Sequence, residues 1–178
     1  MLATAVEGWS DFFVAMAGAA AALAGLLFVA ISINTKEILA ADSLPLRAGQ
    51  TVAVLVGALL ASGVALMELS DLALGLVLLL VTGTTWCFIV LLQIRESRPG
   101  AGAGVADGPS ATARGPQGEE SWVARSIINQ SATLPGVVGS IVLIAGADWG
   151  IYLVAAGVLQ TFAVAVINAW VLLVEILR

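Results

Sequence analysis

Five apolar runs, each about as long as a bilayer is thick, take up most of this chain. A helix needs roughly 20 apolar residues to cross the hydrocarbon core, and there every backbone polar group needs a partner within the protein. Charged residues make up 11% of the sequence, against roughly 25% in soluble domains. We therefore predict one all-α integral membrane domain with five transmembrane helices. The predicted spans cover residues 12–33, 48–67, 72–93, 127–147 and 151–177.

Two of the connections are too short for anything but tight turns. Residues 68–71 separate the second span from the third, and residues 148–150 separate the fourth from the fifth. We expect each of these two pairs to form an antiparallel helical hairpin. The one long polar stretch, residues 98–121, is rich in Gly, Ala, Pro and Ser and has no apolar periodicity. It is predicted to be a disordered cytosolic linker.

The basic residues all fall on one side of the membrane in this arrangement. The N-terminus and the two hairpin turns contain no Lys or Arg. Because cytoplasmic loops carry an excess of Lys and Arg, we predict that the N-terminus lies outside and the C-terminus in the cytosol. The seven basic residues are Lys36, Arg47, Arg95, Arg98, Arg114, Arg125 and Arg178.

The residue types present exclude several classes of function. The chain has no His and a single Cys87, so the usual ligand sets for zinc, haem and iron–sulfur clusters are missing. No nucleophile–His pair can form. The net charge is −5, and acidic residues balance the basic ones on the inner side, so we expect no nucleic-acid partner. We predict no catalytic, cofactor-binding or metal-binding residues.

A stripe of small side chains follows one face of the first span. Steps of three and four residues place its members on the same side of a helix. In lipid, small residues let helix backbones approach closely, and this packing drives association. Three interpretations stay open: the first span is the central helix of a monomeric bundle, it makes a subunit contact, or it lines a pore. The helix-packing or pore face comprises Ala15, Gly18, Ala22, Gly25 and Ser32.

Uncharged polar residues gather at two levels of the predicted bundle. Because buried amides need partners in hydrocarbon, we expect the inner set either to join helices or to line an inward-facing vestibule for an ion or small solute. The inner polar cluster is Gln50, Asn129, Gln130 and Asn168. A second set near mid-membrane consists of Gln160 and Thr161, at the same depth as Thr82, Thr84 and Thr85.

The fourth span contains the sequence Thr133-Leu134-Pro135-Gly136. Proline inside a helix removes a backbone hydrogen bond, so Pro135 and Gly136 predict a kink at this point. Broken helices mark substrate sites in some transporters, but kinks also occur in helices that bind nothing.

Three segments resemble a family of small bacterial integral membrane proteins, common in actinobacteria, whose members are mostly uncharacterised. The segments are residues 9–39 (WSDFFVAMAGAAAALAGLLFVAISINTKEIL), 44–63 (LPLRAGQTVAVLVGALLASG) and 167–178 (INAWVLLVEILR). They cover the first two spans and the last. Some members are labelled modulators of FtsH, a membrane-bound AAA+ metalloprotease. The resemblance implies a multi-pass protein of the bacterial cytoplasmic (inner) membrane, and it brings no catalytic motif.

Together these features predict a non-enzymatic protein that acts by helix–helix association in the lipid bilayer. Its expected role is that of a binding or regulatory subunit, for example of a membrane quality-control protease. The partner is either a second copy, giving a homo-oligomer, or another membrane protein. The alternative is a homo-oligomeric channel for an ion or a small polar solute.

Overall fold

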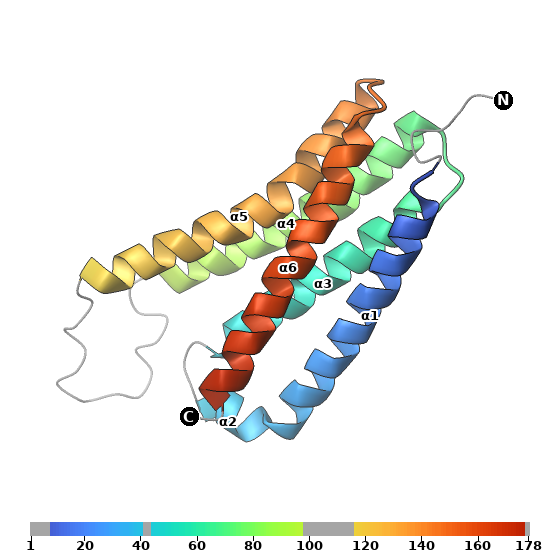
Figure 1. The fold of residues 1–178 in the computed structure, drawn as a ribbon. Helices are drawn as coiled ribbons and strands as arrows, with labels where there is room; N and C mark the ends of the chain where they lie inside the picture. Colours follow the sequence, from blue (N-terminus) through green and yellow to red (C-terminus); the bar gives the residue numbers. More distant parts are fainter. Residues whose placement is uncertain (1–7, 41–43, 98–115, 177–178) are drawn as a thin grey trace.

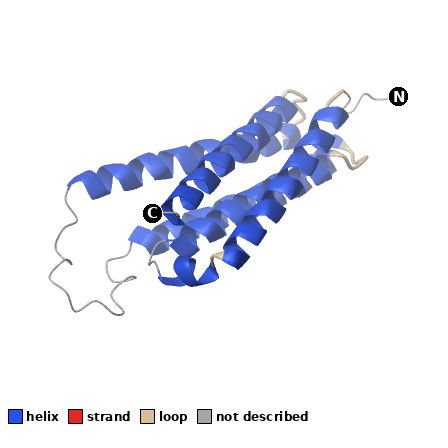
Figure 2. Ribbon diagram, turned by 60° about the horizontal axis from the view of Figure 1, so that its bottom comes forward, coloured by secondary structure: helices blue, strands red, loops and turns tan. Residues whose placement is uncertain are grey.

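The computed structural model describes residues 8–40, 44–97 and 116–176, which form helices joined by short loops (Figures 1 and 2). These ranges contain no strand. Four helices, α1, α3, α4 and α6, are long and apolar enough to cross a membrane, so the prediction of an all-helical membrane protein is confirmed at this level. The helices are α1 (Ser10–Ile33), α2 (Thr35–Ala40), α3 (Leu44–Ala65), α4 (Asp71–Ser97), α5 (Pro116–Ile144) and α6 (Gly150–Ile176).

Four helices form a ring, and α1 packs on the outside of it. In the ring, α3 contacts α4, α4 contacts α5, α5 contacts α6, and α6 closes back onto α3. Helix α1 packs mainly against α3 and slightly against α6, and it lies along one edge of the bundle in Figure 1. Only 17% of the apolar window of α1 is buried, against 56% of that of α3. The interpretation of the first span as the central helix is therefore wrong.

Three large side chains lie on the side of α1 that meets the ring. Phe13, Met16 and Leu27 are buried there together with Ala20. Just before the helix, the ring of Trp9 packs edge-on against Tyr152 of α6, with centroids 5.0 Å apart. Large apolar side chains and this aromatic contact, rather than small residues, hold α1 to the bundle.

The two short turns bring neighbouring helices together in hairpins. Residues 66–70 join α3 to α4, residues 145–149 join α5 to α6, and both pairs pack side by side. In the second turn Gly146 has φ of +80°, a left-handed conformation that glycine adopts at little cost.

Two segments differ from the sequence prediction. Helix α5 begins at Pro116, so residues 116–121 are helical and do not belong to a disordered linker, while residues 98–115 lie outside the described part of the chain. Proline suits the first turn of a helix, where its missing N–H is not needed. The short helix α2 was not predicted. It follows a turn at Asn34, whose Nδ2 donates to the Ala30 carbonyl at 2.9 Å.

Candidate functional site

The stripe of small residues on α1 faces away from the ring. All five of its predicted members are exposed, and a Cβ atom added at Gly18 or Gly25 would meet nothing within 4 Å. At 3.6 residues per turn, the exposed side chains of Leu26 and Phe28 fall on opposite edges of the stripe. The Ser32 hydroxyl donates to the Phe28 carbonyl at 2.8 Å, so its proton is already used within the helix.

Close packing through glycine occurs elsewhere, between α5 and α6. A Cβ added at Gly139 would lie 2.7 Å from the Gly150 carbonyl oxygen, and one added at Gly157 would lie 2.7 Å from the Gly136 nitrogen. Only glycine permits backbones to approach this closely. Sequence reasoning missed this contact, although the signal was available: glycines recur at helical spacing in both arms of one hairpin.

Pro135 lies inside α5, and the helix continues past it to Ile144. The axis of α5 changes direction along its length in Figure 1. Proline cannot donate to the carbonyl four residues earlier, which here belongs to Ser131. At the next carbonyl, that of Ala132, the Thr161 hydroxyl of α6 donates at 3.0 Å. Helix α5 is therefore hydrogen-bonded to α6 next to its proline.

Gln130 of the predicted inner cluster joins α5 to α4. The Trp86 Nε1 donates to its Oε1 at 2.6 Å, and its Nε2 approaches the Gln93 Oε1 at 3.4 Å. We call these three residues the amide ladder. Gln93 is buried, and its Nε2 has no hydrogen-bond partner among the described residues. Gln93 lies at the depth predicted for the inner polar residues, whereas Trp86 was not among the predicted polar residues.

The other members of that cluster lie on three different helices. Gln50 is buried on α3, Asn168 is half-buried on α6, and the side chain of Asn129 lies outside the description.

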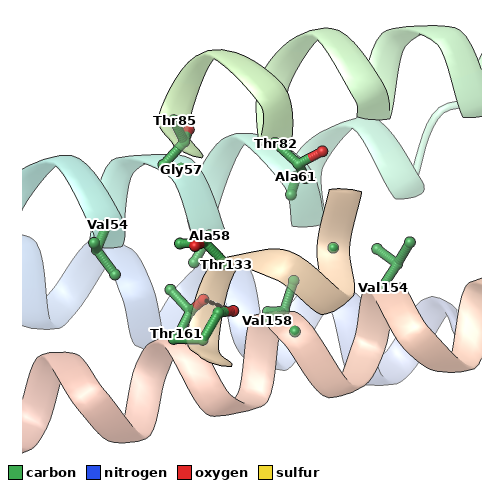
Figure 3. Close-up of a pocket in the computed structure, with 13 residues that line it drawn as sticks. Val54, Gly57, Ala58, Ala61, Thr82, Thr85, Thr133, Val154, Val158 and Thr161 are labelled. Atoms are coloured by element: carbon green, nitrogen blue, oxygen red, sulfur yellow. Dashed lines mark hydrogen bonds between the residues drawn. The ribbon is translucent and has the colours of Figure 1, made fainter. Parts of the chain in front are cut away.

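A narrow cavity lies inside the ring, at the level of the mid-membrane threonines. All four ring helices line it, and the volume open to the centre of a water-sized sphere is about 30 Å³. Figure 3 shows Thr82 and Thr85 of α4 on one side and Thr133 and Thr161 on the other. The rest of the lining is glycine, alanine and valine, without a charged residue.

Three of these threonines use their hydroxyl protons on backbone carbonyls. Thr82 donates to Leu78 at 2.7 Å, Thr85 donates to Val81 at 2.8 Å, and Thr161 bonds Ala132 as described. Thr84 and Gln160, which sequence reasoning placed in the same group, are exposed instead. Gln160 donates from Nε2 to the Ser131 hydroxyl at 3.1 Å.

Within the described ranges, no three His, Cys, Asp or Glu side chains lie close enough together to hold a metal ion.

No protein-family model, curated protein or solved structure matches this chain.

Proposed function

We propose that this chain is a five-span protein of the bacterial cytoplasmic membrane that acts as a non-enzymatic binding or regulatory subunit through the outer face of α1. In this proposal the N-terminus lies outside and the C-terminus in the cytosol, which the one-sided distribution of Lys and Arg supports. In this proposal α5 is the fourth span along the chain and brings the number of spans from four to five. Its apolar part, Gln130–Ile144, is shorter than the other spans, but it packs between α4 and α6.

The observation that carries the proposal is the stripe of small exposed residues on α1. Small residues run along the middle of its outer face, with free space above Gly18 and Gly25. In lipid, a second helix gains most from a surface its backbone can approach closely. Large side chains are exposed on both helices: Val14, Leu26, Phe28, Val29 and Ile33 on α1, and Leu72, Leu76, Leu80, Phe88 and Leu91 on α4. Helix α1 differs in the exposed small residues that lie between them, Ala15, Gly18, Ala22 and Gly25.

The partner is a transmembrane helix of a second copy or of another membrane protein. Resemblance of residues 9–39 and 44–63 to a family with members labelled FtsH modulators supports a membrane-bound AAA+ protease as the partner. These residues include the whole of α1. A channel lined by α1 has less support, because the one hydroxyl in the stripe, that of Ser32, already donates to its own helix.

Replacing Gly25 with Leu tests the proposal, with Leu26→Phe as the matched control on the edge of the stripe. Because Gly25 has open space above it, the Gly25→Leu protein should fold normally. We expect it to lose either its dimer in size-exclusion light scattering or its co-purification with the AAA+ protease, whichever the wild type shows. Leu26→Phe should keep that association. If Gly25→Leu retains every association of the wild type, the outer face of α1 is not the binding surface.

A further inference from the structure

The cavity inside the ring has an almost entirely apolar surface, although threonines contribute to its lining. The Thr82 hydroxyl donates to the Leu78 carbonyl at 2.7 Å and lies 3.4 Å from the Ser140 hydroxyl. Its methyl carbon lies beside Gly136, which lines the cavity: a Cβ added at that glycine would be 3.2 Å from it. Thr82 therefore keeps its hydroxyl among polar atoms of the helices and borders the cavity with its methyl group.

The remaining lining offers little to a polar ligand. The hydroxyls of Thr85 and Thr161 donate to backbone carbonyls, and most of the other lining residues are glycine, alanine and valine (Figure 3). A buried water needs two to four polar partners, and an ion needs an opposite charge or many polar ligands to replace its hydration. A cavity with this lining is expected to exclude both.

The helices around the cavity cannot move together to close it, because they already touch at glycines that line it. A Cβ added at Gly157 of α6 would lie 2.7 Å from the Gly136 nitrogen of α5, and one at Gly57 of α3 would lie 2.6 Å from the Thr85 methyl carbon of α4. The short side chains between these contacts leave the space unfilled. Atoms that border an empty space lose attractive contacts, so a guest of the right size is favoured there.

The volume of the cavity limits the size of that guest. A water-sized sphere needs roughly 10–15 Å³ of volume open to its centre, and the cavity has about 30 Å³. Drug-sized ligands need about ten times this volume or more. A guest of about two or three non-hydrogen atoms fits between the four helices.

We propose that the ring is a binding site for one small apolar molecule of the size of dioxygen, taken up from the hydrocarbon core of the membrane. Apolar molecules leave water for an apolar environment, so the lipid around the helices holds them at a higher concentration than the cytosol does. The site lies inside a single bundle. It is independent of the partner that α1 meets, so either proposal can fail without the other.

Xenon is the first probe, because it binds dry apolar cavities. In methyl-labelled wild type in lipid nanodiscs, we expect the Val158 methyl signals, from the cavity lining, to shift with xenon pressure and reach a plateau. Val166, which is exposed on the same helix, should shift in proportion to pressure without a plateau, because xenon also dissolves in lipid. Val164 is the matched buried control: it is 6% exposed, against 5% for Val158, and does not line the cavity. Its signals should hardly move.

Dissolved oxygen gas is the second probe, because it is paramagnetic and speeds the relaxation of nearby nuclei. We expect the Val158 methyl groups to relax as fast as those of lipid-facing Val166, and several times faster than those of Val164. Equal, slow relaxation at Val158 and Val164 would show that oxygen does not enter the ring and would overturn the proposal for this ligand.

Variants that change the volume of the cavity locate the site. Ala61→Val adds two methyl groups to the lining and should abolish the plateau at Val158. Val158→Ala enlarges the cavity, so with Val54 of the lining as the reporter the plateau should be reached at lower xenon pressure. Val166→Ala, on the outer surface of the same helix, should change nothing.

Three results would overturn the proposal. The first is a wild type in which Val158 shows no xenon shift, or only the linear shift of Val166. The second is xenon binding that is unchanged in both Ala61→Val and Val158→Ala; if Ala61→Val does not fold, an unchanged Val158→Ala is sufficient. The third is magnetisation transfer from water to the Val158 methyl groups, which would show that the cavity is hydrated.

Discussion

The glycines of α5 and α6 have surroundings opposite to those of the glycines of α1. At Gly139 an added Cβ would lie 2.7 Å from backbone, whereas at Gly18 and Gly25 it would meet nothing within 4 Å. Both sets sit in apolar helices at spacings that suit close helix packing. In α5 and α6 the partner is the other arm of the hairpin. In α1 no other part of the described chain takes that place, so we look for the partner outside this bundle.

The largest effect should follow from enlarging a glycine that already has a partner. In Gly139→Leu the new side chain would overlap the Gly150 carbonyl and the Val154 nitrogen. Overpacking of this kind costs about 3 kcal/mol or more, so we expect a large fall in the thermal midpoint in detergent, or no folded protein. The control is Gly18→Leu on α1, which should melt close to the wild type. Equal thermal midpoints for Gly139→Leu and Gly18→Leu would show that the glycines of α5 and α6 are no more closely packed than those of α1.

Crosslinking tests whether the exposed glycines of α1 contact a partner helix. The single native cysteine, Cys87, is exposed and is first replaced by Ser. In that background we expect Gly25→Cys to crosslink to its partner in native membranes under mild oxidation or with a short bifunctional reagent. Leu80→Cys, on the exposed large-residue face of α4, should crosslink far less. Similar yields at both positions would mean that α1 meets lipid just as α4 does.

A smaller effect should follow from removing the hydrogen bond that accompanies the α5–α6 contact. Thr161→Val deletes the donor to the Ala132 carbonyl, and a net loss of about 1 kcal/mol is expected for a buried bond of this kind. Thr84→Val removes a hydroxyl that bonds only its own helix and should change stability by less. Chemical or thermal unfolding in detergent measures both values, and a larger loss for Thr84→Val would contradict the assignment.

The smallest change is a single methyl group on the vacant stripe. Gly18→Ala places its Cβ in open space and should stabilise the isolated helix by up to about 1 kcal/mol. If a partner helix packs against Gly18, the same methyl group should weaken association measurably. A variant that is more stable and associates as strongly as the wild type would place the contact elsewhere on α1.

The helical class and most helix positions could be predicted from the apolar runs, because the bilayer sets their length. Which helices are most buried in the bundle could not be predicted. The apolar window of α1 has the highest mean hydropathy, 2.4, with 17% buried, while that of α3 has 1.7 with 56% buried. In lipid the outer surface is as apolar as the interior, so hydropathy does not rank helices by depth in the bundle. That ranking depends on side-chain size and on which helix meets which.

The candidate site could be predicted only in part, because the sequence gives the depth of a residue in the membrane but not the neighbours of its side chain. Depth along a span follows from residue number, and Thr82, Thr85 and Thr161 do line one cavity. The direction of a side chain around the helix axis depends on packing, and Thr84, next to Thr85 in sequence, points outward. The amide ladder was missed because only amides and hydroxyls were considered as polar groups, whereas the indole N–H of Trp86 also needs an acceptor when it is buried.

The ring closes between helices that are far apart in the chain, and this has a consequence for biosynthesis. Helix α1 can dock on α3 as soon as both are in the membrane, but α3 meets α6 only after Gly150–Ile176 has been made. At about 5–20 residues per second, the stretch between Ala65 and Gly150 takes several seconds to translate. During that interval Thr51 and Ser62 of α3, which are buried in the finished bundle, are in the membrane before α6 has packed against α3. A ribosome that stalls before α6 would leave an open, polar-lined half-bundle, the kind of unfinished product that membrane proteases remove.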